Sequence, residues 1–267
     1  MENQALYNFA KVVYDYCGLN YLHNLTTLHL KMAKHLKSLH ITHYEDYLMY
    51  LNKHPEQWEN IVELLTINET YFYREEKQFH TFCDKVYKPF IQKQNQPLKL
   101  WSAACSTGEE PYSLIMNTLQ IDEKACERIE IIATDINQSV LQFASEAKYF
   151  HKSLAFRRIP SNWLEQYFEH EGLFVTVQPF IKEVVSFQHL NLLAFDQYPD
   201  DQSLDVIFCR NVLIYFDEQT IEKVVRGFYK ALKKGGVLFL GHAEMISKLN
   251  IGFQTVNDNG TFYYRKE

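Results

Sequence analysis

The chain has 267 residues, and its 27 basic and 33 acidic side chains give a formal net charge of −6. This balance argues against a protein that binds nucleic acid through bulk charge, because phosphate contacts need a basic surface. The sequence contains no apolar run of membrane-spanning length and no signal-peptide pattern at its start, so we expect a cytoplasmic protein that is not a membrane protein.

Residues 1 to about 70 predict helices throughout, because apolar side chains such as Phe9, Val12, Val13 and Tyr16 recur at helical spacing. The segment Thr42–Glu45 has the form of a capping box, which predicts the start of a helix there. Pro55 predicts the start of another helix, since proline is tolerated in a first turn. The sequence therefore predicts a small all-α N-terminal domain over residues 1–70.

From Leu98 onward the pattern changes to strands that alternate with helices. This order predicts an α/β domain over residues 71–267, with a mostly parallel sheet covered on both faces. The alternation in Gly172–Pro179 predicts a small antiparallel β insertion at about 166–183, and Tyr263 and Tyr264 predict an antiparallel edge pair. The expected strands are Leu98–Ser102, Ile129–Thr134, Val184–His189, Leu204–Cys209, Gly236–Leu240 and Thr261–Arg265, and the expected helices are Glu109–Leu119, Ser139–Ala147 and Glu218–Lys233.

The first strand leads through a turn of small residues, Ser102–Gly108, directly into a helix that begins with two acids. A strand, a tight turn and a helix in this order form the ligand-binding corner of an open α/β sheet. The second strand ends at Asp135, where a carboxylate can accept hydrogen bonds from ribose hydroxyls. Neither G-x-G-x-x-G nor G-x-x-x-x-G-K-[ST] occurs, which disfavours dinucleotides and nucleoside triphosphates. The acids favour a positively charged nucleoside without phosphates, such as S-adenosylmethionine; the alternative is an ordinary strand–helix corner.

Three further segments with polar side chains are expected near the carboxyl ends of the strands. Ligands of open α/β sheets bind at that edge. Ile67–Glu75 joins the helical region to the sheet and contains Arg74. Asn191-Leu192 follows the third strand, where an asparagine can read an adenine edge. Cys209–Asp217 follows the fourth strand and carries Arg210, Asn211 and Tyr215.

Taken in order, these motifs resemble the CheR-type chemotaxis receptor methyltransferases. The matching pieces are Asn68–Arg74, Ser106–Ser113, Ala133–Asp135, Asn191-Leu192, Phe208–Asp217 and Gly241–Glu244. The resemblance implies a helical N-terminal domain followed by a Rossmann-like methyltransferase domain with a small antiparallel β insertion. It also implies a bacterial protein-glutamate O-methyltransferase of chemotaxis signal transduction. Such an enzyme transfers methyl groups from S-adenosyl-L-methionine to glutamate γ-carboxylates of chemoreceptor cytoplasmic helices and leaves S-adenosyl-L-homocysteine.

The family's functional residues carry over to ten positions of this chain, and no metal is implied. The expected catalytic residues are Arg74 and Tyr215: Tyr215 corresponds to the tyrosine often placed beside the reacting methyl group, and Arg74 would position the substrate carboxylate. The implied cofactor contacts are Asn68, Thr70, Arg74, Glu110, Asp135, Asn191, Leu192, Arg210 and Asn211. Family members often have glycine where this chain has Ala104, a difference that matters only if the backbone there needs a positive φ.

The implied partner is the cytoplasmic domain of a chemoreceptor, and we expect the protein to be a monomer. The basic segment with Lys31, Lys34, His35 and Lys37 would dock acidic receptor helices; the alternative is a solvated helix face. Some family members grip a receptor's C-terminal peptide with the β insertion, and the sequence leaves this open here. The remaining alternatives are a small-molecule carboxyl methyltransferase, a non-catalytic S-adenosylmethionine-binding scaffold and, more remotely, a NAD-linked oxidoreductase.

Overall fold

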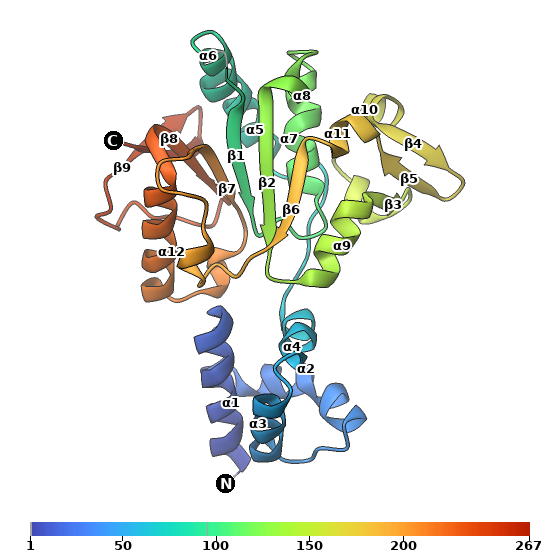
Figure 1. The fold of residues 1–267 in the computed structure, drawn as a ribbon, viewed down its shortest axis with the longest axis vertical. Coiled ribbons are helices and arrows are strands. Elements are labelled where there is room, and N and C mark those ends of the chain that lie inside the picture. Colours follow the sequence, from blue (N-terminus) through green and yellow to red (C-terminus); the bar gives the residue numbers. More distant parts are fainter. Residues whose placement is uncertain (1, 95) are drawn as a thin grey trace.

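The computed structural model describes residues 2–94 and 96–267. Four helices come first and stand apart from the sheet in Figure 1, and they pack around an apolar core of their own. They are α1 (Glu2–Cys17), α2 (Leu25–Ser38), α3 (Tyr44–Lys53) and α4 (Gln57–Leu65). The expected capping box does not form, because His43 is the N-cap of α3 and its side chain bonds none of the described N–H groups. Helix α4 begins two residues after Pro55.

A seven-stranded sheet forms the centre of the remaining chain, with strand order β6-β2-β1-β7-β8-β10-β9. The strands are β1 (Leu98–Ala103), β2 (Ile129–Asp135), β6 (Val185–His189), β7 (Leu204–Cys209), β8 (Leu232–Leu240), β9 (Phe253–Asp258) and β10 (Thr261–Lys266). The first five in the spatial order run parallel, and β10 pairs antiparallel with both β8 and β9. The predicted mixed α/β fold is confirmed. The outermost strand beyond β10 is β9, which the sequence did not predict.

Helices cover both faces of this sheet, so its side chains alternate between two apolar cores. In β1, Leu100 packs in one core and Trp101 in the other. Helix α12 (Glu218–Ala231) lies on the Trp101 face, and α7 (Glu109–Leu119) lies on the Leu100 face. The helices of this part are α5 (Glu76–Phe82), a π-helical segment (Cys83–Tyr87), α6 (Lys88–Ile91), α7 (Glu109–Leu119), α8 (Ala125–Arg128), α9 (Gln138–Glu146), α10 (Ser161–Tyr167), α11 (Pro179–Lys182) and α12 (Glu218–Ala231).

A second, three-stranded antiparallel sheet protrudes beside α9, with strand order β3-β5-β4. Strands β4 (Phe168–Glu171) and β5 (Phe174–Val177) confirm the β insertion expected at about 166–183. The third strand, β3 (Lys148–Phe150), lies outside that range. Three residues are too few to show the alternation that marks a strand in sequence.

The helical part contacts the sheet part at the C-terminal end of α1. The Tyr14 hydroxyl donates to Asp217 Oδ2 at 2.7 Å, and Asn191 Nδ2 donates to the Tyr16 carbonyl at 2.6 Å. These bonds hold α1 against the carboxyl ends of the strands. Within the described part of the chain, every helix is too short or too polar to cross a membrane.

Candidate functional site

A cavity of about 360 Å³ lies between the helical part and the carboxyl ends of β1, β2, β6 and β7. The carboxyl ends of parallel strands meet at one edge of a sheet, so segments distant in sequence converge there. The structure brings all the predicted site residues to its wall: Asn68, Thr70, Arg74, Glu110, Asp135, Asn191, Leu192, Arg210, Asn211 and Tyr215. The helical part closes the other side with residues that include Tyr21, Thr27 and Lys31.

The turn between β1 and α7 has an unusual backbone. Ala104, Ser106 and Gly108 have φ angles of 60°, 50° and 89°. Only glycine adopts such angles without cost, so the turn is strained at the first two positions. The backbone at Ala104 does have a positive φ, so having alanine there, where family members often have glycine, carries a cost. Strain of this kind concentrates at ligand sites.

Replacing Ala104 with glycine should raise the free energy of unfolding by roughly 0.5–1 kcal/mol. The left-handed backbone costs alanine about 1–2 kcal/mol, and the extra freedom of glycine in the unfolded chain offsets part of the gain. Urea titration gives the difference. Ala10→Gly in the middle of α1, where the backbone is helical, should have the opposite sign. A loss of stability in Ala104→Gly would show that its conformation carries no strain.

Asp135 ends β2 and is only 6% exposed. Its Oδ2 accepts from the Ser106 N–H at 2.8 Å, and its Oδ1 accepts from the Asn137 N–H at 2.9 Å. Burial raises the pKa of this carboxyl, and the backbone donors act in the opposite direction. Each carboxylate oxygen has a second acceptor site. The carboxylate is thus held in a fixed orientation on the cavity wall with capacity for further donors.

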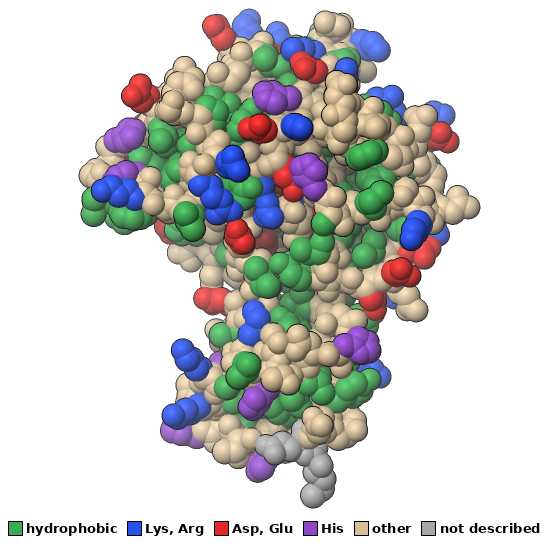
Figure 2. Space-filling view, turned by 180° about the vertical axis from the view of Figure 1, so that it is seen from behind, with side chains coloured by type: hydrophobic (Ala, Val, Ile, Leu, Met, Phe, Trp, Pro, Cys, Tyr) green, Lys and Arg blue, Asp and Glu red, His purple; other side chains and the backbone are tan. Residues whose placement is uncertain are grey.

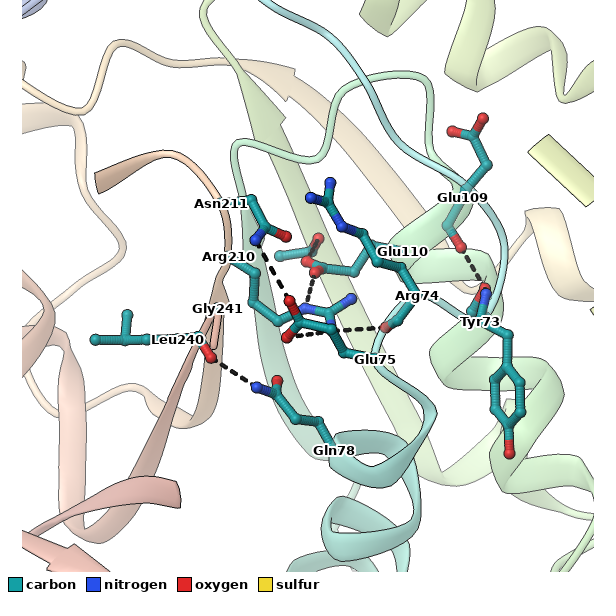
Figure 3. A network of polar contacts seen from close by, with 12 residues as sticks. Tyr73, Arg74, Glu75, Gln78, Glu109, Glu110, Arg210, Asn211, Leu240 and Gly241 are labelled. Carbon is teal, nitrogen blue, oxygen red and sulfur yellow. Dashed lines mark hydrogen bonds and ion pairs between the residues drawn. The ribbon is translucent and has the colours of Figure 1, made fainter. Parts of the chain in front are cut away.

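Arg210 is enclosed by acidic groups rather than directed at open space (Figure 3). Its Nε donates to Glu110 Oε2 at 2.6 Å, and its Nη1 donates to the Arg74 carbonyl at 2.8 Å. Glu75 Oε2 lies 3.6 Å from Nη1, and the Arg210 side chain is 2% exposed. Because two carboxylates already surround it, Arg210 is not free to pair with a substrate carboxylate. The other Glu110 oxygen accepts from the Ser102 hydroxyl.

Arg74 is the more available cation of the site. Its Nη1 donates to the Glu69 carbonyl at 2.9 Å, and its side chain forms no ion pair with the described acidic residues. Tyr215 lies in the short turn Leu213–Tyr215 after β7 and lines the same cavity. Burial raises the pKa of the Tyr215 hydroxyl, and the positive charge of Arg74 opposes this shift. A cation and a phenol therefore lie together at one wall of the cavity.

The amide side chains of the site bond to the protein itself. Asn191 Nδ2 donates to the Tyr16 carbonyl, and Asn191 Oδ1 accepts from the Leu193 N–H at 2.9 Å. Asn68 donates to Thr66 Oγ1 at 3.2 Å, and Asn211 has a φ of 61°. The predicted adenine contact of Asn191 stays a prediction, since both ends of its amide already have partners.

Glu244 stabilises the backbone of a loop of the site. The sequence singled out the motif Gly241–Glu244 but did not reveal this role. The Glu244 carboxylate accepts from the N–H groups of Asn211, Gly241 and Leu213 at 2.8, 2.6 and 2.7 Å. A Cβ on Gly241 would lie 2.7 Å from Asn211 Nδ2, so only glycine fits. The acid and the glycine together fix the loop that carries Asn211 and Tyr215.

The basic segment on α2 divides between the interior and the surface. Lys31 lines the cavity and donates to the carbonyls of Leu64 and Leu65, each at 3.2 Å, at the end of α4. His35 is partly buried, whereas Lys34 and Lys37 are exposed. Of the four residues expected to form a docking surface, two, Lys34 and Lys37, are therefore exposed.

Comparison with known proteins identifies clear relatives. Residues 68–262 match the family model described as CheR methyltransferase, SAM binding domain. The chain is 35% identical to a chemotaxis protein methyltransferase of Escherichia coli over 252 residues, which cover 91% of this chain and 85% of that protein. It is 35% identical to chemotaxis protein methyltransferase 2 of Vibrio cholerae, over 79% of this chain and 74% of that protein. For the chemotaxis protein methyltransferase of Borreliella burgdorferi the identity is 31%, over 92% and 89%.

Proposed function

Because the chain belongs to the CheR family of chemotaxis methyltransferases, we propose that it methylates glutamate γ-carboxylates on the cytoplasmic helices of chemoreceptors. The chain is an S-adenosylmethionine-dependent methyltransferase of chemotaxis. The observation that carries the finer proposal is the cavity, which combines buried acids suited to a cationic nucleoside with one available arginine at its wall.

The cavity suits S-adenosylmethionine in its chemistry. The ligand carries a sulfonium and an ammonium, and the carboxylates of Asp135 and Glu110 lie on the wall. Asp135 would accept from the ribose hydroxyls, and Glu110 would stabilise the amino end of the methionine moiety. The remaining contacts would come from Asn68, Thr70, Arg74, Asn191, Leu192, Arg210 and Asn211. When bound, the cofactor supplies an electrophilic methyl group.

The protein's task is to position the substrate. A glutamate with an ordinary pKa of about 4.3 is ionised at neutral pH, so its oxygen needs no general base. Arg74 would orient the carboxylate, while the cavity walls would exclude water and hold the reacting atoms in line. Too tight an ion pair would weaken the nucleophile, and the Arg74 guanidinium is shared with the Glu69 carbonyl. Tyr215 would lie beside the reacting methyl group.

Two substitutions should separate cofactor binding from turnover. Asp135→Ala should cost about 1.5–3 kcal/mol of cofactor affinity, because it removes a charged hydrogen-bond acceptor. Tyr215→Phe should leave affinity nearly unchanged and slow turnover, because only the hydroxyl is lost. Calorimetry and initial rates measure the two effects, and thermal denaturation controls for folding. Equal losses of affinity in both variants would contradict this division of roles.

The helical part would form the docking surface for the receptor, with the protein working as a monomer in the cytoplasm. Figure 2 shows basic and histidine side chains at the surface of this part, at the lower end of the view. Lys34 and Lys37 are exposed on α2, next to the highly exposed Leu30. An acidic receptor helix would meet both charge and apolar surface there.

Reversing Lys34 and Lys37 to glutamate should raise KM for receptor fragments and leave cofactor affinity unchanged. Exposed charges are screened over about 10 Å at 0.1 M salt, so the wild-type KM should also rise with salt. Lys93→Glu with Lys124→Glu is the matched control, since these exposed lysines adjoin α6 and α8, which lie at the other end of the molecule from α2 in Figure 1. A reversal that matches wild type at low salt would identify a solvated face.

The proposed function is tested with methyl-labelled S-adenosylmethionine and receptor cytoplasmic fragments. The expected result is label on the receptor that mild base releases as methanol, as for a carboxyl ester. Label found only on small organic acids would favour a small-molecule carboxyl methyltransferase. Cofactor binding without any transfer would favour a non-catalytic scaffold.

A further inference from the structure

A third arginine, Arg157, contacts the cavity wall through Glu69. It follows the turn Leu154–Phe156 that leaves β3, in the part of the chain that carries the small sheet. Its Nη2 donates to Glu69 Oε1 at 2.8 Å, and its guanidinium carbon lies 3.7 Å from the centre of the Tyr71 ring. Glu69 lines the cavity, and its side chain is 67% exposed. Arg157 therefore binds the carboxylate of a glutamate that lines the site.

The position of Arg157 is fixed by the packing behind it. The Phe72 N–H donates to the Ala155 carbonyl at 2.8 Å, and the rings of Phe72 and Phe156 stack with centroids 5.2 Å apart. Phe72 is fully buried. The turn that carries Arg157 is thus held on the segment that carries Tyr71 and Arg74.

Arg157 and Arg74 share the same two neighbours. Arg74 donates to the backbone carbonyl of Glu69, and its guanidinium carbon lies 5.6 Å from the centre of the Tyr71 ring. The two arginines therefore lie on either side of the same pair of residues, Glu69 and Tyr71. Figure 2 shows basic side chains on the sheet part above the waist of the molecule.

We propose that Arg157, stacked on Tyr71, binds a second carboxylate of the substrate segment, next to the glutamate that Arg74 orients. In the structure Glu69 fills this position and acts as an internal competitor of the same chemistry as the substrate. Because Glu69 is exposed, its pair with Arg157 contributes little and can be exchanged for a substrate carboxylate. Arginine on an aromatic face suits this role, since its planar fork matches a carboxylate. The proposal rests on the proposed function and assigns to Arg157 the recognition of an acidic neighbour of the methylated glutamate.

Three variants test it by methyl transfer to receptor cytoplasmic fragments. Arg157→Ala should raise KM for the fragment about 5–10-fold, with kcat and cofactor Kd within twofold of wild type. Glu69→Gln should lower KM about twofold, because the competing charge is gone. Arg158→Ala is the matched control, since the neighbouring arginine is exposed and pairs with none of the described acidic side chains. It should leave KM within twofold of wild type.

Comparing the Arg157→Ala and Glu69→Gln variants distinguishes substrate binding by Arg157 from a structural role. If Arg157 serves only to hold Glu69 in place, both variants should raise KM alike, and the proposal is overturned. An Arg157→Ala variant with the wild-type KM overturns it as well. If Arg157→Ala does not fold, Glu69→Gln decides: a KM below wild type supports the proposal, and one at or above wild type overturns it.

A change in the substrate gives an independent arm. In this arm, the acidic residues beside the methylated glutamate of the fragment are replaced by glutamine. With wild-type enzyme, the KM for this changed fragment should rise as much as Arg157→Ala raises the KM for the original fragment. With the Arg157→Ala enzyme, the KM for the changed fragment should rise no further. A full further rise would overturn the proposal. Failure of the proposed function looks different, because wild-type enzyme would then put no label on any receptor fragment.

Discussion

Replacing Glu110 with alanine should lower the free energy of unfolding by about 3 kcal/mol. The substitution removes the closest partner of Arg210, whose side chain is 2% exposed. Breaking a buried pair costs 3–5 kcal/mol when the remaining charge is left uncompensated. In the variant, Glu75 at 3.6 Å and the Arg74 carbonyl would still partly compensate the charge of Arg210. We therefore expect a loss at the lower end of this range. Urea titration measures the change.

An exposed pair of equal length provides the control. Glu222 Oε1 lies 2.6 Å from Arg226 Nη2 in α12, but these side chains are 45% and 53% exposed. Glu222→Ala should therefore cost no more than about 0.5 kcal/mol. If the two alanine variants lose the same stability, the buried cluster around Arg210 does not organise the site as described.

Replacing Glu109 with glutamine should stabilise the protein at pH 8 by up to about 3 kcal/mol. Glu109 is 3% exposed, and burial raises its pKa from 4.5 to about 7, with the Thr107 hydroxyl opposing the shift. Ionising this carboxyl in the folded protein is therefore costly, at 1.36 kcal/mol for each unit of the shift. Glutamine removes the charge and keeps an oxygen that can accept from Thr107.

The sign follows from the protons bound in each state. Between pH 4.5 and about 7 the folded protein keeps a proton on Glu109 that the unfolded chain has released. Wild-type stability should therefore fall across this window as pH rises, relative to Glu109→Gln, and the difference should level off above pH 7. Near pH 4.5 the two proteins should be nearly equal.

Glu218→Gln is the control for this pH dependence, because Glu218 also lies in the first turn of a helix but is exposed. Its difference from wild type should be small and nearly constant between pH 5 and 8. Parallel stability profiles for wild type and Glu109→Gln would mean that Glu109 does not hold a proton in the folded state.

Elements with a strong pattern could be predicted from the sequence almost to the residue. Helix α7 and strand β7 have the predicted ends, because each has a clear apolar pattern and a definite signal at its boundary. Strand β9 was missed because it is an edge strand whose residues are all exposed or only partly buried. Such a strand depends on pairing with β10 rather than on a pattern of its own.

The composition of the site could be predicted, but not the bonds within it. The predicted residues line one cavity because the carboxyl ends of parallel strands converge, which is a property of the fold. The partners of Arg210 and Asn191 lie up to 136 and 175 residues away, so no local pattern reveals them. The inward position of Lys31 likewise depends on where α4 ends.

A crystal structure of the protein with S-adenosyl-L-homocysteine tests the site most directly. It should show the ribose hydroxyls within hydrogen-bond distance of Asp135 and the sulfur facing the wall with Arg74 and Tyr215. The homocysteine amino group should lie on the side of Glu110. A ligand bound outside this cavity, or a sulfur directed away from Arg74 and Tyr215, would contradict the proposed assignment of roles.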